Sequence, residues 1–392
     1  RQTSESGYSE SGTDGEAPSC SSSENGQFRR ELRLRMKKFG DLLQGADHLV
    51  LKDIIGSGAS SQVWKASFRG EPVAAKQFQI RDPAAMQRFH MEAYFLASIR
   101  HPNIVQMFGL CVSVEDGLGW IIMECLPLSL EDMLHKSNDN AFESFQLVDR
   151  CVFLLDVTRA VTHLHSLTPP IIHRDIKPGN ALLSLLDITV KLCDFASAMQ
   201  GDIGEGVNGT VGTPSFIAPE VLASAPCTTE SDVYSLAGLW YEVLTGRRLS
   251  SGNPYEAMVR TMESREGTLN TDGLPEVLTT TVEAAFGAAA GRPTSSKMLD
   301  VLERFYRTIS SGVHSSSFTS GSDGTRGTRK RIRSVLTQSS LASVWAQLGG
   351  SSMEVEREQG ILANPGDRPR VQNFVQTSSG STVFNSYLSD TM

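Results

Sequence analysis

The run from His173 to Asp194 contains the residue types needed to transfer a charged group to a hydroxyl. Asp175 can accept the proton of an attacking hydroxyl, and Lys177 can neutralise charge on the transferred group. Asn180 and Asp194 supply amide and carboxylate oxygens, donors that suit Mg²⁺. Phosphoryl transfer requires little covalent chemistry from a protein beyond an oriented hydroxyl, metal ions and cationic groups. The run therefore favours phosphoryl transfer, whereas a lone aspartate in a loop is more commonly a turn former.

A glycine-rich turn and an upstream lysine are suited to binding phosphates. The turn runs from Gly56 to Val63 with the sequence GSGASSQV, and glycines allow backbone N–H groups to approach and cradle a phosphate. A plain Gly-Ser hairpin turn is the common alternative. Lys76 ends the apolar run VAAK, where a charge needs a partner. Glu92, at the edge of the apolar stripe of the next helix, is the predicted partner.

Two hydrophobic periods indicate the elements that position these residues. Short segments rich in β-branched or aromatic residues, separated by glycine-bearing turns, predict strands at 49–55, 62–68 and 72–78. Asp82-Pro83 is an N-cap with a first-turn proline, and apolar residues then recur at helical spacing up to Leu96. Further helices are predicted at 147–161 and 233–244. We expect an α+β, bilobal fold with a small β-rich lobe, a larger helical lobe and a ligand cleft between them.

Composition and charge narrow the classes of partner. The 392 residues are 40% hydrophobic and 20% charged, which is ordinary for a globular chain. The net charge of -8 argues against nucleic acid as a partner, since phosphate backbones select basic faces. The six cysteines lack metal-ligand spacing, which favours reduced thiols and a cytoplasmic location. No apolar run is long enough to span a bilayer, but membrane tethering through a missing upstream segment stays open because the chain begins without methionine.

Changes in composition predict four segments: a disordered Ser/Gly/Glu-rich leader at 1–28, a basic linker at 29–48, a folded domain at 49–308 and a Ser/Gly-rich, disordered tail at 309–392. Arg29–Lys38 has Leu32 and Met36 at helical spacing. It is interpreted either as a solvated helical face or as a weak contact for an acidic membrane surface or acidic partner. The basic cluster Arg326–Arg333 in the tail is either solvated or a nuclear-import signal.

Taken together, these motifs resemble the eukaryotic protein kinase family over residues 49–308. HRDIKPGN and DFA resemble the kinase catalytic and metal-binding loops, GSGASSQV the glycine-rich loop, and VAAK the strand that carries the nucleotide lysine. HPNIV resembles the loop after the first helix, and GTPSFIAPE the substrate-docking segment. Two positions depart from the family pattern: Ser61 and Ala196 replace glycines, which makes both turns stiffer.

The resemblance implies an enzyme that transfers the γ-phosphoryl group of ATP to protein hydroxyls with the help of Mg²⁺. Asp175 would be the base and Lys177 would steady the phosphoryl group. Lys76, held by Glu92, would contact the nucleotide phosphates. The implied magnesium ligands are Asn180 and Asp194. The implied nucleotide-binding positions are Ile55, Gly56, Ser57, Gly58, Ala59, Ser60, Ser61, Gln62, Val63, Ala74, Lys76, Met123, Glu124, Cys125, Leu126 and Leu182.

Further pairs follow from the same resemblance. Glu220 would pair with Arg292, and Asp232 would anchor the backbone of the catalytic loop. Arg174, beside the predicted base, is the cation that in related kinases meets a phosphate on the activation segment. Thr210 is the predicted site of that phosphate, and the alternative is that it is an ordinary loop residue.

Specificity is predicted from residues around the base. Lys177 and Thr213 are typical of serine/threonine kinases, and the run SDVYSLAGLWYEVLTGR resembles the tyrosine-kinase-like branch of these enzymes. We therefore expect a signal-transduction kinase that acts on protein serines and threonines; the oligomeric state is left open. One alternative is a nucleotide-binding pseudokinase scaffold, which Ser61 and Ala196 favour. The other is a tyrosine or dual-specificity kinase.

Overall fold

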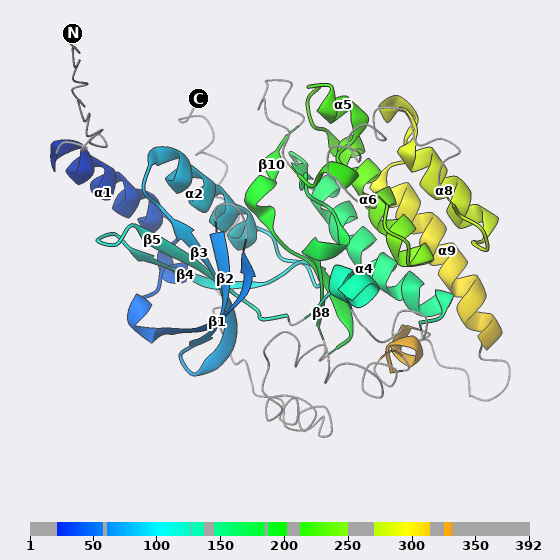
Figure 1. The fold of residues 1–392 in the computed structure, drawn as a ribbon, viewed down its shortest axis with the longest axis horizontal. Coiled ribbons are helices and arrows are strands. Elements are labelled where there is room, and N and C mark those ends of the chain that lie inside the picture. Colours follow the sequence, from blue (N-terminus) through cyan, green and yellow to red (C-terminus); the bar gives the residue numbers. More distant parts are fainter. Residues whose placement is uncertain are drawn as a thin grey trace, which may run out of the picture. The chain divides into compact units, whose positions relative to one another are not determined.

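The protein is described by a computed structural model that covers residues 22–57, 61–126, 128–136, 145–184, 187–201, 212–249, 270–313, 325–330 and 332. These residues all belong to one unit, Arg1–Leu341. Figure 1 shows a β-rich lobe, drawn in blue and cyan, and a helical lobe, drawn in green and yellow. The fold is therefore α+β and bilobal, as predicted.

Five antiparallel strands form the sheet of the small lobe, in the order β1-β2-β3-β5-β4. The strands are β1 Leu49–Ser57, β2 Ser61–Phe68, β3 Glu71–Gln79, β4 Met107–Ser113 and β5 Leu118–Met123. On one face, Phe68, Val73 and Ala75 pack in a cluster with Trp120. Because side chains alternate along a strand, Lys76 lies on the opposite face of β3, where it is also buried.

Helix α2, Pro83–Ser98, packs its apolar side toward this sheet. Asp82 caps the helix by accepting a hydrogen bond from a backbone N–H three residues later, at 2.7 Å. Phe89 contacts Phe78 of β3 edge to face, with ring centroids 5.2 Å apart. Glu92 lies one helical turn further on and is buried on the same side.

The large lobe is built from helices α4 Leu147–Ser166, α5 Pro219–Leu222, α6 Thr229–Thr245, α8 Glu276–Phe286 and α9 Ser295–Val313. Helix α4 is central, since it packs against both α6 and α9 (Figure 1). Its buried Thr158 accepts a hydrogen bond from the indole of Trp240 on α6 at 3.0 Å. Helix α6 ends at Gly246, whose φ of 72° is the left-handed conformation that glycine adopts without cost.

Short strands lie within the run from His173 to Asp194 or pair with segments in or beside it. They are β6 Leu128–Ser129, β7 Ile171–Ile172, β8 Ala181–Ser184, β9 Thr189–Leu192 and β10 Met199–Gln200. Strands β8 and β9 form an antiparallel hairpin, and β6 pairs with the free edge of β8. Strand β7 pairs with β10. The hairpin begins directly after Asn180 and ends two residues before Asp194, so it connects the two predicted metal ligands.

Helix α1, Ser22–Lys37, corrects two expectations at the start of the chain. Leu32 and Met36 are buried, and the helix packs against α2, so the apolar side of Arg29–Lys38 is covered from within the protein and is not a wholly solvated face (Figure 1). The helix also begins inside the predicted leader, 1–28. Once an anchored segment has nucleated a helix, extending it through polar residues costs little.

The predicted tail also contains described structure. Helix α9 continues to Val313, beyond the predicted boundary at residue 308, and residues 325–330 are helical. Within the basic cluster Arg326–Arg333, Arg329 forms an ion pair with Asp156 of α4. The cluster is therefore not solvated throughout, because one of its arginines meets a buried carboxylate.

Two findings bear on the expectations from composition. The five described cysteines are free thiols. Of the helices that the structure describes, none has the length and apolar character needed to cross a bilayer.

Candidate active site

The loop after β7 is anchored by hydrogen bonds to a carboxylate of helix α6. Asp232 accepts hydrogen bonds from the backbone N–H groups of His173, at 2.7 Å, and Arg174, at 2.8 Å, so the predicted anchoring contact is present. His165 lies 3.1 Å from the same carboxylate. Burial disfavours the charge of Asp232, but His165, together with His173, outweighs this and holds its pKa below the ordinary range.

Both carboxylate oxygens of Asp175 have fixed partners. Lys177 Nζ donates to Oδ2 at 2.8 Å, and Asn180 Nδ2 donates to the same oxygen at 2.7 Å. Thr213 donates to Oδ1 through its backbone N–H and its hydroxyl, each at 3.0 Å, and its Oγ1 also accepts from Lys177 at 2.6 Å. These four residues form one network, the Asp175 network, which orients the carboxylate without burying it fully.

Lys76 contacts two carboxylates at once. Its Nζ lies 2.7 Å from Glu92 Oε1 and 2.6 Å from Asp194 Oδ1. Burial works against the charge of Lys76, but the two carboxylates outweigh burial and raise its pKa, so the lysine stays protonated. Burial raises the pKa of Glu92 above its usual range, and Lys76 opposes this. We call these three residues the Lys76 network.

Asp194 follows β9 in a left-handed conformation, with φ 65°. Burial alone would raise the pKa of its carboxyl, but Lys76 holds it below the ordinary value. The next residue, Phe195, is fully buried and meets the ring of His173 edge to face at 4.9 Å. Ala196 is not among the described residues with positive φ. Alanine therefore fits the backbone here, and Asp194 supplies the left-handed turn instead.

A backbone contact links the two networks: the N–H of Cys193 donates to the carbonyl of Asn180 at 2.9 Å. This contact places Cys193, which precedes Asp194, beside Asn180, which binds Asp175. Among the predicted site residues, the structure thus brings together Lys76, Glu92, Asp175, Lys177, Asn180 and Asp194 through side-chain hydrogen bonds and this backbone link.

The described nucleotide positions lie on strands β1, β2, β3 and β8 and in the segment 123–126 at the end of β5, which we call the hinge. Gly56 pairs with Val63 across the β1–β2 hairpin, and Ala74 of β3 pairs with Met123 at the end of β5. Leu182 is half-buried on β8. Other predicted positions with a described backbone are Ile55, Ser57, Ser61, Gln62, Glu124, Cys125 and Leu126. Gly58, Ala59 and Ser60, at the tip of the hairpin, lie outside the described residues.

Glu124 shows how the hinge is fixed. Its backbone N–H donates to the carbonyl of Gln106 at 3.0 Å, and its side chain accepts from the backbone N–H of the same residue at 2.7 Å. Lys191 of β9 also contacts this carboxylate at 2.7 Å. This bridge between the hinge and β9 could not be predicted from the sequence, because two charged residues 67 positions apart carry no shared motif.

The activation segment, residues 194–220, is described at 194–201 and 212–220. The predicted pair of Glu220 and Arg292 is present, with two hydrogen bonds of 2.5 and 2.9 Å. Arg174 donates from its guanidinium to the carbonyl of Ser197. Thr210, the predicted phosphate site, lies outside the described residues.

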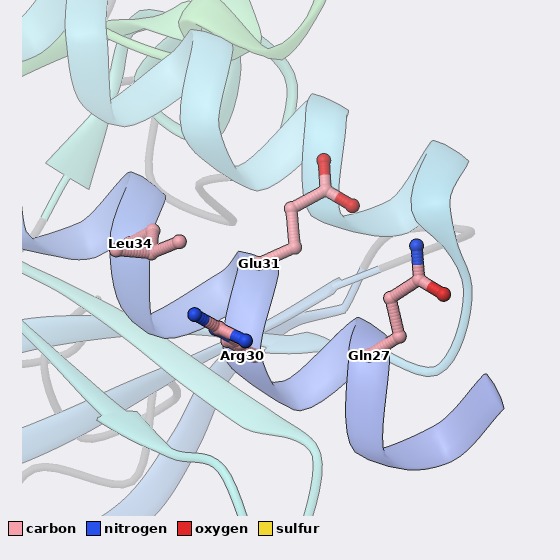
Figure 2. A pocket seen from close by; sticks show the side chains of 4 residues that line it. All are labelled: Gln27, Arg30, Glu31 and Leu34. Atoms are coloured by element: carbon pink, nitrogen blue, oxygen red, sulfur yellow. The ribbon is translucent and has the colours of Figure 1, made fainter. Parts of the chain in front are cut away.

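A surface pocket lies elsewhere, on α1. Figure 2 shows the four side chains that line it: Gln27, Arg30, Glu31 and Leu34. None of them belongs to the predicted site, and the pocket is open to solvent. We therefore assign the chemistry to the Asp175 and Lys76 networks and not to this pocket.

Comparison with known proteins agrees with this geometry. Residues 49–308 match the protein kinase domain family. The chain is 34% identical over 231 residues to the LRR receptor-like serine/threonine-protein kinase GSO2 of Arabidopsis thaliana, covering 56% of this chain and 18% of that protein. It is 36% identical over 201 residues to the serine/threonine-protein kinase CTR1 of the same plant, covering 50% and 24%.

These relatives are much longer than the aligned part, since the chain spans less than a quarter of the length of either one. The family match itself covers about two thirds of the present chain, from β1 into α9. On this match, and on the fold that carries it, the chain belongs to the protein kinase domain family.

Proposed function

We propose that the chain is a Mg²⁺-dependent protein kinase that transfers the γ-phosphoryl group of ATP to serine and threonine hydroxyls. The observation that carries the proposal is the position of Lys76 Nζ, within 2.7 Å of both Glu92 and Asp194. A buried lysine needs opposite charge to compensate its desolvation, and the two carboxylates keep Lys76 protonated and fixed in position. Next to the Asp175 network, that charge is available to the phosphates of a nucleotide.

The residues present fit a magnesium ion. Asn180 Nδ2 is bound to Asp175, which leaves the amide oxygen as the donor for a cation. Asp194 offers a carboxylate that is partly exposed. The described residues hold no cluster of three or more histidine, cysteine or acidic side chains, which suits an ion that takes its remaining ligands from phosphates and water. When bound, Mg²⁺ would neutralise charge on the phosphates.

The remaining steps are assigned to side chains of this chain. Asp175 would accept the proton as the substrate oxygen bonds to the γ-phosphorus and the bond to the β-phosphate oxygen breaks, releasing ADP. Lys177, 2.8 Å from Asp175, would neutralise charge on the phosphoryl group in transit. Lys76, fixed by Glu92, would hold the nucleotide phosphates in register.

Serine/threonine specificity is supported by Thr213. Its hydroxyl joins Lys177 to Asp175, so the two residues that are typical of serine/threonine kinases meet at the proposed base. The names of GSO2 and CTR1 point to the same specificity. Membership of the tyrosine-kinase-like branch rests on the α6 sequence and is part of this proposal.

The pseudokinase alternative rests on Ser61 and Ala196. Ala196 fits its backbone without strain, which weakens that argument, and the candidate catalytic side chains all have partners. The test is incubation of the purified chain with labelled ATP, Mg²⁺ and a generic protein substrate, followed by phosphoamino-acid analysis, with Asp175→Asn as the control. Phosphotyrosine as the main product would reverse the specificity. Nucleotide binding without any transfer would favour the pseudokinase.

A further inference from the structure

A buried carboxylate in α4 has no place in the proposed mechanism. Asp156 is 1% exposed and lies on the central helix of the large lobe. Its Oδ2 accepts a hydrogen bond from the backbone N–H of Val190, in β9, at 3.0 Å. One backbone hydrogen bond does not compensate the loss of water around a buried charge. Burial accordingly raises the pKa of Asp156, and a cation is needed to keep it ionised.

Arg159, one turn along α4, forms a longer ion pair with Asp156 at 4.0 Å. The closer cation comes from outside the family match. Arg329 Nη2 donates to both oxygens of Asp156, at 2.7 and 2.9 Å, although 173 residues separate the two in the sequence. The neighbouring Thr328 is buried, and its hydroxyl lies 2.9 Å from the hydroxyl of Tyr306 on α9. Ile332 is fully buried as well. Residues 325–330 and 332, which we call the C-terminal strap, are thus attached to the large lobe through Thr328 and Arg329.

The same guanidinium reaches the turn of the β8–β9 hairpin. Arg329 Nη1 donates to the backbone carbonyl of Ile188. Ile188 has φ 56°, and a β-branched residue in the left-handed region is strained and persists only where its surroundings hold it there. One arginine therefore holds the strained turn through Ile188, and it also holds Asp156, which binds β9 through Val190.

We propose that Arg329 is a positioning residue, and that the C-terminal strap fixes the β8–β9 hairpin that connects Asn180 with Asp194. The inference rests on the metal-binding roles proposed for these two residues. The hairpin begins at the residue after Asn180 and ends at Leu192. Each of its two strands runs between the turn and one of the proposed ligands, so the strands are the direct path by which a shift of the turn would reach Asn180 and Asp194. The functional kinase unit of this chain then extends past residue 308, to at least Ile332.

The test uses the full chain and the variant Arg329→Gln. We expect amide hydrogen exchange over residues 187–192 to become about 10-fold faster, because the strained turn loses its partner. We expect Tm to fall by about 5–10 °C, since the buried carboxylate loses both short hydrogen bonds and keeps only the more distant Arg159, at 4.0 Å. The Mg²⁺ concentration for half-maximal binding of a fluorescent ATP analogue should rise about 3- to 10-fold, somewhat less than for partners in direct contact with metal ligands.

Two further variants separate positioning from general damage. Lys330→Gln removes the same charge from an exposed position in the strap and should match the wild type in all three measurements. The double variant Asp156→Asn/Arg329→Gln removes the buried charge together with its cation, so it should recover most of the lost Tm but not the protection of the turn, which still lacks the contact to Ile188.

Two results would overturn the proposal. In the first, Arg329→Gln exchanges over 187–192 at the same rate as Lys330→Gln. In the second, the turn loosens while the Mg²⁺ dependence of nucleotide binding is unchanged, which would make the strap purely structural. A wild-type chain that binds no nucleotide with Mg²⁺ would instead refute the proposed function, and hydrogen exchange would still decide whether Arg329 holds the hairpin.

Discussion

Replacing Glu92 with glutamine separates the charge of this side chain from its shape. Glu92 Oε1 accepts from Lys76 Nζ at 2.7 Å, whereas the buried Oε2 has no hydrogen-bond partner within the described part of the chain. Glutamine can keep an acceptor at Oε1 and place its amide nitrogen at the other position. The substitution therefore removes one of the two negative charges on Lys76 and leaves Asp194, at 2.6 Å, as the other.

The effect on stability should be small. A hydrogen bond to a charged group contributes about 1.5–3 kcal/mol and a neutral one about 0.5–1.5 kcal/mol, so the weaker bond costs on the order of 1 kcal/mol. Burying an amide costs less than burying a carboxylate, which offsets part of that loss. For a domain of this size we expect Tm to fall by no more than about 4 °C.

The effect on activity should be larger. With one carboxylate gone, Lys76 is drawn toward Asp194 and away from the nucleotide phosphates. A loss of about 1.4–2.8 kcal/mol in transition-state stabilisation corresponds to about a 10- to 100-fold fall in kcat/KM. The KM for ATP should rise at the same time, because Lys76 contacts the nucleotide in the ground state as well.

Initial rates at varied ATP, together with calorimetric Tm values, measure both effects. Glu283→Gln, on the exposed face of α8, is the matched control and should behave as the wild type. A Glu92→Gln enzyme with unchanged kcat/KM, alongside an inactive Lys76→Met enzyme, would show that the lysine works without its partner on α2 and would refute the reasoning.

Three other predictions follow from the site and from α2. Asp175→Asn should lower turnover about 10²- to 10⁴-fold while leaving ATP affinity nearly intact; equal turnover in rate assays would remove Asp175 as the base. Asp194→Asn should weaken Mg²⁺-dependent nucleotide binding and turnover together. A titration with Mg²⁺ that gave the same dependence in the variant and the wild type would contradict this prediction. Burial, with the charges of Arg35 and Lys38, lowers the pKa of His90 to about 4. Because the unfolded state then binds more protons than the folded state between pH 6.5 and 4, stability should fall as the pH drops through this window. Urea unfolding at pH 7 and at pH 5 should show that the free energy of unfolding falls less between these pH values in His90→Gln than in the wild type.

The catalytic loop could be predicted from the sequence because its partners are local. Asp175, Lys177 and Asn180 lie within six residues, and their side chains meet in the structure. Glu92 could be predicted from helical periodicity, since the apolar stripe of α2 decides which side faces Lys76. Asp232 and the Glu220–Arg292 pair could be placed only through the resemblance to kinases, because nothing in their spacing reveals what they contact.

Other contacts depend on docking between distant segments and leave no local signal. Leu32 and Met36 do have helical spacing, but the arginines and lysines around them fitted a solvated helix or a membrane contact equally well. Only the packing of α1 on α2 decides between these interpretations. Arg329 is one of several basic residues in the cluster Arg326–Arg333, and the composition of this cluster is typical of a solvated segment. Its role depends on a carboxylate 173 residues away.

Three buried carboxylates, Asp232, Glu92 and Asp156, differ in where their compensation comes from, and this difference has a consequence for the enzyme. Asp232 is satisfied by backbone N–H groups of the loop that it holds, and Glu92 by the lysine that it orients. Asp156 instead takes its closest cation from the C-terminal strap. Proteins open locally where docking is weakest, so release of the strap would leave Asp156 with only the more distant Arg159 as a cation, while the other two anchors stayed intact. The geometry of Asp194 should therefore depend on the strap more than on any other segment outside residues 49–308.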